Sequence, residues 1–132
     1  IWTCDSHSTA TSVPVKPLEE AGGSGMLTVW ACTFKEGKSF VDLASADMQW
    51  VAHMDQVGME GGLYRWIPDA GWARDDNTDY LIVYASEDLV MRGRTIDLLW
   101  AGSGQVLNSI YDGIQQCDNP RIWDASAVGG RS

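Results

Sequence analysis

The residues best suited to chemistry are hydroxyl and thiol groups that stand among large aromatic side chains. The polar members, each in a predicted strand, are Cys32, Tyr64, Tyr80 and Tyr84. The aromatic residues beside them in the same strands are Trp30, Phe34 and Trp66. A few polar groups that converge within an apolar surface are what a small-molecule site requires. We therefore take these seven residues as the candidate ligand-binding set and assign no catalytic residue.

Two segments carry metal-ligating residue types but lack a complete ligand set. Cys4 and His7 have the spacing of half a zinc site, and the later Cys-Asp pair at 117–118 has no matching histidine. The acidic loop Asp75–Asp79 begins like a calcium loop, but its sixth position is Tyr80, where glycine is required. We predict no metal site and no cofactor, and we interpret the loop as a solvated acidic turn.

His53 is the remaining candidate for acid-base chemistry. An imidazole titrates near neutral pH and could serve as a general base beside a cavity. Its spacing from Trp50 and Val57 places it at the edge of a predicted apolar helix stripe, which favours a boundary histidine with satisfied polar atoms. No Gly-x-Ser-x-Gly elbow occurs, and Ser86 beside two acids is interpreted as a helix cap. The sequence therefore indicates no particular reaction.

Composition excludes several classes of protein. A chain of 132 residues that is 45% hydrophobic and 20% charged is sufficient for one folded domain with a real core. Nine basic against eighteen acidic residues give a net charge of -9, which argues against nucleic acid or an anionic membrane as partner. No apolar run is long enough to span a bilayer, so we expect a soluble protein. No targeting segment is visible after Ile1, and localisation stays open.

The three cysteines, Cys4, Cys32 and Cys117, are too few for a disulfide scaffold. An odd number leaves at least one thiol unpaired within the chain. Free cysteine is often buried, so we expect these residues to act as small buried hydrophobes.

Hydrophobic periodicity and turn signals place the elements that must position these residues. Ser39 with Asp42 three residues later predicts a capped helix, which ends at Gly58. A second helix is expected from Ser86 to about Trp100. The other predicted elements are strands 26–34, 63–67 (closed by Pro68), 79–85 and 121–128, and a helical stretch around 106–114.

This order predicts an α+β, ferredoxin-like βαββαβ domain over residues 26–128, an antiparallel sheet with helices on one face. Residues 17–25 are interpreted as a linker, and residues 1–16 as an extra N-terminal strand. Cys4-Asp5 with Val15 recurs as Cys117-Asp118 with Val128, an offset of 113 residues. Residues 1–16 could therefore be the tail of a preceding repeat.

Alternation along the strands separates two faces of this sheet. Leu27, Val29 and Ala31 fall on one face, together with Leu81 and its alternating neighbours. This aliphatic set is expected under the helices. The aromatic candidate set, which Trp123 can join, is then expected on the helix-free face, as a patch too large for a monomer to leave in water.

Three functions fit an aromatic sheet face. RNA-recognition domains have this topology, but a net charge of -9 would repel phosphates. Pairing of two such sheets resembles the dimeric α+β barrel superfamily, through the topology and one-sided helices of residues 26–128. That resemblance implies a cavity for small apolar or aromatic substrates, as in cofactor-independent monooxygenases, or for haem in other members, and many members have no known activity. The third possibility, which we place first, is a non-catalytic association module that forms a homo-oligomer through this face.

A second resemblance is more local. The segment Cys32–Lys38, followed by Trp50 in a helix, is similar to uncharacterised bacterial proteins with a Cys-Thr-x-x-x-Gly-Lys segment after a strand. This resemblance implies a fold and implies no chemistry.

Overall fold

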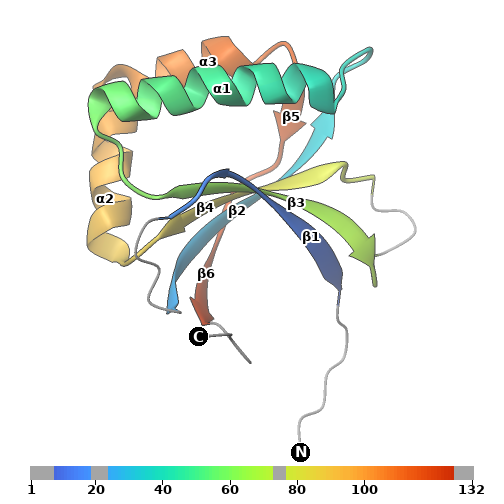
Figure 1. Ribbon diagram of the computed structural model, residues 1–132, viewed down its shortest axis with the longest axis horizontal. Helices are drawn as coiled ribbons and strands as arrows, with labels where there is room; N and C mark the ends of the chain where they lie inside the picture. The colour runs from blue at the N-terminus through green and yellow to red at the C-terminus, as the bar shows by residue number, and fades with distance from the viewer. Residues whose placement is uncertain (1–7, 19–23, 73–76, 127–132) are drawn as a thin grey trace, which may run out of the picture.

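The computed structural model describes residues 8–18, 24–72 and 77–126. The described chain forms two layers, an antiparallel six-stranded sheet and helices that cover one of its faces (Figure 1). The elements are β1 (Thr9–Lys16), β2 (Ser24–Phe34), α1 (Phe40–Val57), β3 (Gly62–Ala70), β4 (Tyr80–Ser86), α2 (Leu89–Leu98), a π-helical turn η1 (Leu99–Ser103), α3 (Gly104–Tyr111), β5 (Gln115–Cys117) and β6 (Arg121–Ser126). The predicted α+β class is confirmed, and the architecture is broadly compatible with a ferredoxin-like fold.

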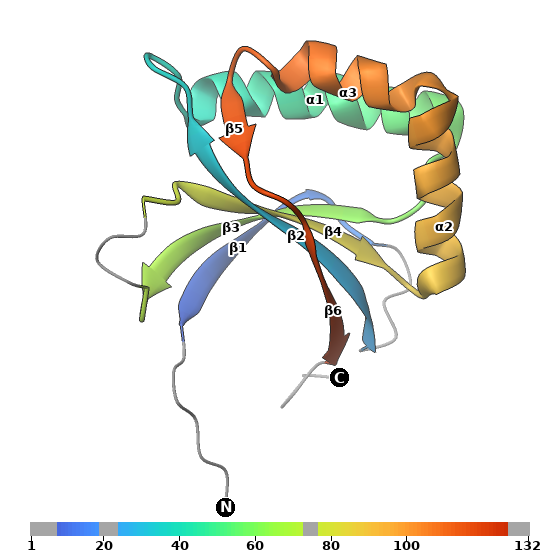
Figure 2. The same cartoon turned by 180° about the vertical axis from the view of Figure 1, so that it is seen from behind.

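The strands are ordered β1-β3-β4-β2-β5, and β6 also pairs with β2. The predicted final strand corresponds to β6, which pairs with residues 24–29 of β2, and the short strand β5, which was not predicted, pairs with Cys32–Phe34 of the same strand (Figure 2). At the other edge, β1 pairs with β3, so the expected N-terminal strand is present. Pro68 does not close the second strand as expected, since β3 continues to Ala70 with Pro68 opposite Ala10.

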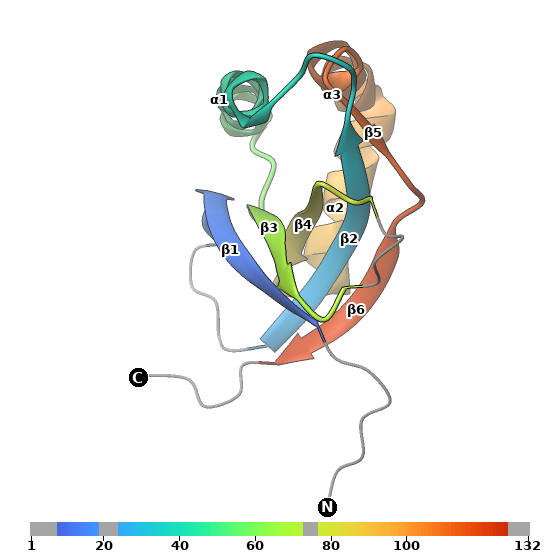
Figure 3. The ribbon, with the colours of Figure 1, turned by 90° about the vertical axis from the view of Figure 1, so that its right-hand side faces the viewer.

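Helix α1 begins and ends as the sequence indicates. Ser39 accepts a hydrogen bond from the backbone of Val41, while the Asp42 carboxylate accepts one from the Ser39 backbone at 3.0 Å. Gly58 ends the helix in the left-handed region, at φ 71°. Viewed along the sheet, α1 lies above the side that holds β1 and β3, and α3 lies above the side that holds β2 and β5 (Figure 3).

The second helical segment begins two residues later than expected. Ser86 is the fully buried last residue of β4, and the cap of α2 is Asp88, whose carboxylate accepts from the Met91 backbone at 2.8 Å. The segment then bends within η1, where Gly102 has a φ of 130° that residues other than glycine rarely adopt. The bend turns α3 across the sheet, whereas α2 stands at one end of it (Figures 1 and 2).

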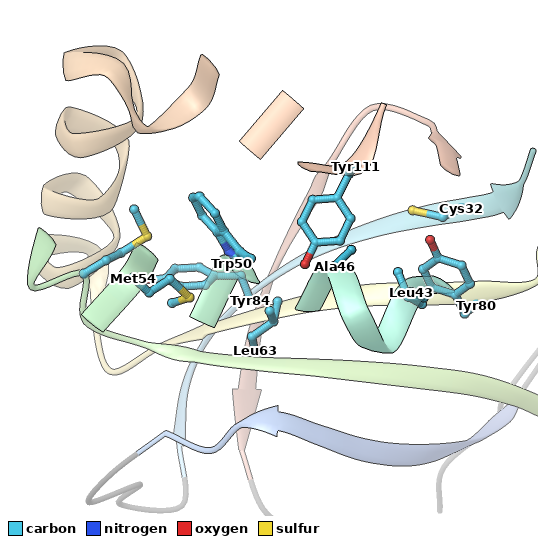
Figure 4. Packing of buried hydrophobic residues seen from close by; sticks show 10 residues of the cluster. Cys32, Leu43, Ala46, Trp50, Met54, Leu63, Tyr80, Tyr84 and Tyr111 are labelled. Carbon is cyan, nitrogen blue, oxygen red and sulfur yellow. The ribbon is translucent and has the colours of Figure 1, made fainter. Parts of the chain in front are cut away.

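The expected assignment of the two sheet faces is wrong. Tyr80, Tyr84 and Cys32 belong to the buried cluster beneath the helices, with Trp30, Phe34 and Ile82 packed against it. Figure 4 shows this cluster between the sheet and α1, together with Trp50, Met54 and Tyr111. Strand alternation separates two sets of side chains but does not say which set meets the helices.

The aliphatic set lies on the helix-free face instead. Leu81, Val83 and Ala85 of β4 alternate with the buried tyrosines, and the strand register places Leu27, Val29 and Ala31 of β2 opposite them. Tyr64 and Trp66 of β3 pair with Val83 and Leu81, and Trp123 of β6 pairs with Leu27. For Tyr64, Trp66 and Trp123, the expected location on the helix-free face is confirmed.

Cys32 and Cys117 form a disulfide, which the sequence reasoning did not anticipate. The two residues are directly opposite in the β2–β5 register, with Cα atoms 4.1 Å apart. The expectation that both are unpaired buried hydrophobes is therefore wrong. A separation of 85 residues could not indicate the pairing, because only the sheet brings β5 beside β2.

Candidate functional site

A partly open cavity of about 400 Å³ lies between the helices and the covered face of the sheet. Its floor is made of two consecutive cross-strand pairs of β2 and β4, Thr28 with Tyr84 and Trp30 with Ile82. The helices contribute Trp50 and Met54 from α1, Thr95 and Ile96 from α2, and Leu107 and Asn108 from α3. The cavity thus combines large apolar side chains with polar and charged groups from several elements, as ligand sites in proteins do.

Trp50 is positioned by the apolar stripe of α1. Leu43, Ala46, Trp50 and Met54 are buried at helical spacing, so the indole must face the sheet. The His53 ring stacks on Trp50, with centroids 5.3 Å apart, and its Nε2 is 2.9 Å from the buried Ser103 hydroxyl. His53 does not line the cavity, and these contacts match a histidine at the edge of the core with a satisfied nitrogen.

A buried ion pair joins the sheet to α1 beside the cavity. Arg65 of β3 donates from Nε to Asp47 Oδ2 at 3.2 Å, and its Nη2 contacts Oδ1 of the same carboxylate. Tyr111 of α3 donates to Asp47 Oδ1 at 2.6 Å. The Arg65 guanidinium lies 5.6 Å and 5.7 Å from the ring centroids of Tyr80 and Tyr111. Its Nη1 is buried and has no hydrogen-bond partner among the described residues, so it faces aromatic rings rather than acceptors.

Burial determines the protonation of the tyrosines in this layer. Burial raises the pKa of Tyr111, and the nearby Asp47 carboxylate raises it further. Burial likewise raises the pKa of Tyr80. The pKa of Tyr84 is also raised by burial, and its hydrogen bond with Thr95, 2.5 Å between oxygens, opposes that shift. All three hydroxyls therefore remain neutral at physiological pH and act as hydrogen-bonding groups.

The second arginine of the cavity lies on α2. Arg92 is half-buried and donates from Nε to the Thr28 hydroxyl at 3.1 Å. It forms no ion pair with any carboxylate of the described residues, whereas Arg94, two residues later, pairs with Glu60 at 3.0 Å. A cationic group with free donors thus stands at the Thr28–Tyr84 end of the floor.

The structure distributes the seven candidate residues over three places. Trp30 and Tyr84 line the cavity, and Cys32 lies next to it through its disulfide partner Cys117, which does line it. Phe34 and Tyr80 pack at the other end of the layer, with centroids 5.1 Å apart, against Phe40 at the start of α1. Tyr64 and Trp66 lie on the opposite, helix-free face. The expected single aromatic site is therefore not formed.

Sequence reasoning missed Asp47, Arg65 and Arg92 as parts of this site. A signal was present for the first two. Asp47 interrupts an otherwise apolar helix stripe, and Arg65 alternates with Leu63 and Ile67 on the covered face of β3. A charge within a buried stripe implies a buried partner of opposite sign. Arg92 gave no such signal, because it lies on a helix with weak apolar periodicity.

The described part of the chain contains no group of three or more residues that could hold a metal ion. Cys4 and His7 lie outside the described residues, as do Asp75 and Asp76 of the acidic loop. Its last residue, Asp79, accepts a hydrogen bond from the Phe34 backbone at 2.7 Å. Among the helices of the described ranges, none has the length and apolar character needed to cross a membrane.

No known protein family, curated protein or solved structure matches this chain.

Proposed function

We propose that this protein binds a small, largely apolar molecule in the cavity between its sheet and its helices. The main observation in support of this proposal is the cavity of about 400 Å³, whose lining contains two indole rings, Trp30 and Trp50, and several polar groups. Such a volume falls within the usual range for small-molecule sites, about 300 to 1,000 Å³. No catalytic step is proposed.

The side chains that line the cavity indicate a binding site for a ligand rather than a defect in core packing. Native cores contain few voids larger than a water molecule, because each missing contact weakens packing. This cavity is partly open to solvent and has room for far more than one water molecule, and α1, α2, α3 and the sheet all contribute to it. Its polar groups, such as Tyr84, Thr95 and Asn108, come from different elements and surround an apolar centre. That arrangement suits a ligand with an apolar body and few polar atoms.

We propose further that the fold is a ferredoxin-like unit with an extra strand at one edge. The order β3-β4-β2 with β5 and β6 beyond, all antiparallel, supports this assignment. In the dimeric α+β barrels that the sequence resembles, the cavity would lie between two paired sheets. The site proposed here instead lies within one chain, on the other side of the sheet.

Titration with a neutral solvatochromic dye, a naphthalene ketone, tests the binding. We expect its emission to shift to shorter wavelength with a saturable, one-site isotherm. Leu107→Phe fills part of the cavity, so it should weaken binding tenfold or more. Ile110→Phe is the matched control, since Ile110 is a half-buried residue of the same helix that does not line the cavity. Equal binding by the two folded variants would place the dye elsewhere.

A second function, association of two copies through the helix-free face, is supported by a different observation. That face carries the half-buried Tyr64 and Trp66 and the half-buried aliphatic residues of β2, and none of the described helices covers it (Figure 3). At its edge, Trp123 is 57% exposed. Light scattering after size-exclusion chromatography should give a dimer at micromolar concentration, and Trp123→Glu should convert it to monomer. A monomer for the unaltered protein would refute the association.

A further inference from the structure

The two arginines of the cavity differ in what remains for a ligand to bind. Arg65 is neutralised by Asp47, and the side chains of this pair are 5% and 9% exposed. A carboxylate placed beside Arg65 would face the Asp47 carboxylate as well. Arg92 uses one donor for Thr28 and keeps its terminal nitrogens without an anionic partner in the described part of the chain. Arg92 is therefore the group of this cavity that can attract an anion.

The acids nearest the cavity are already engaged or exposed. Asp118 accepts from the Ala31 backbone at 2.8 Å and pairs with Arg121 at 3.2 Å. Glu60 pairs with Arg94. Asp112 lines the cavity as an exposed residue and forms no ion pair among the described residues. In a chain with a net charge of -9, Arg92 is a half-buried cation that no carboxylate of the described residues pairs with, and its donors are suited to an anionic ligand.

The floor of the cavity shows how such a ligand would lie. Arg92 stands over the Thr28–Tyr84 pair, and the next pair on the same face is Trp30 with Ile82. Successive pairs on one face of an antiparallel sheet are about 6.8 Å apart. This spacing suits a carboxylate that is joined directly or through a short link to an aromatic or aliphatic ring.

On the basis of the proposed binding function, we propose that the ligand is a small apolar carboxylic acid whose carboxylate is held by Arg92 and the Thr28 hydroxyl. Its apolar body lies on Trp30 and Ile82. The uncharged Tyr84 hydroxyl, which hydrogen-bonds to Thr95 and to the Glu60 carbonyl, belongs to the same end of the cavity floor.

The test compares two probes of nearly equal shape, 2-naphthoate and 2-acetylnaphthalene, by displacement of the naphthalene dye. The acid should bind at least tenfold more tightly than the ketone, because hydrogen bonds to charged groups are the stronger class. Arg92→Gln should remove this preference and leave the ketone affinity within about twofold. Arg94→Gln is the matched control, since Arg94 is on the same helix, forms an exposed ion pair and does not line the cavity.

The outcomes separate the two proposals. If the ketone binds the unaltered protein as tightly as the acid, or Arg92→Gln keeps the acid preference, the carboxylate subsite is refuted and cavity binding stands. If neither probe nor the dye binds, the proposed function itself fails. Thr28→Val is an independent test. It should reduce the affinity for 2-naphthoate and leave the affinity for 2-acetylnaphthalene unchanged.

Discussion

The Cys32–Cys117 disulfide should supply a large part of the stability of this domain. The bond ties β5 to β2 across a separation of 85 residues. In the chain-entropy treatment, closing a loop of that length removes about 15 cal/mol/K from the unfolded state, or about 4.6 kcal/mol at 25 °C. Native domains are stable by only about 5 to 15 kcal/mol, so reduction removes a substantial fraction.

The expected shift in melting temperature follows from the size of the chain. With about 2.1 cal/mol/K of unfolding entropy per residue, 132 residues give about 0.28 kcal/mol/K. A loss of about 4.6 kcal/mol then lowers Tm by about 16 °C. The perturbation is reduction of the Cys4→Ala variant, in which Cys32 and Cys117 are the remaining cysteines.

The assay combines calorimetry with thiol titration in denaturant. Without reductant, the Cys4→Ala variant should have no titratable thiol, and after reduction it should have two. The reduced and alkylated sample should melt about 16 °C lower than the oxidised one. Two titratable thiols in the unreduced sample would show that the disulfide is not formed. Equal melting temperatures for the oxidised and reduced samples would show that the disulfide does not stabilise the domain.

Three further predictions concern the packed layer. Gly61→Ala should cost about 2 kcal/mol or more in urea unfolding, because a Cβ there would meet a buried tyrosine ring at a φ of 106°, whereas Gly37→Ala, with open space around it, should cost about 1 kcal/mol. Asp47→Asn should cost about 3 to 5 kcal/mol by chemical denaturation, because Arg65 would stay buried without its counterion, and a loss below 1 kcal/mol would contradict the ion pair. Because burial raises the pKa of Tyr111 in the folded protein above its ordinary value of 10.0, stability should fall as pH rises beyond about 10, and absorbance at 295 nm should report the ionisation of Tyr111 only with unfolding.

Local chemistry was sufficient to place most elements. The Ser39–Asp42 box and Gly58 mark α1 because capping depends on residues a few positions apart. The strands around Trp30 and Tyr84 follow from β-branched and aromatic runs bounded by turn residues. These signals do not depend on what lies across the fold.

The candidate site could be predicted only in part. Trp30 and Tyr84 were proposed and do line the cavity, whereas Phe34 and Tyr80, on the same two strands, pack against Phe40 outside it. Asp88 was missed as the cap of α2, since Ser86, two residues earlier, is also of a type that caps helices. The role of Arg92 could not be predicted from the sequence, because only the packing of α2 on the sheet brings its guanidinium to the Thr28 hydroxyl.

The sequence by itself determined the α+β class, the extent of α1, the approximate positions of the central strands, and a chain too acidic to favour nucleic acid. Only the tertiary structure decided which sheet face meets the helices, that Cys32 meets Cys117, and that Arg65 meets Asp47. The physical reason is that alternation and capping are properties of neighbouring residues. The side of a sheet that helices cover, and the groups that meet across it, depend on contacts between segments far apart in the chain.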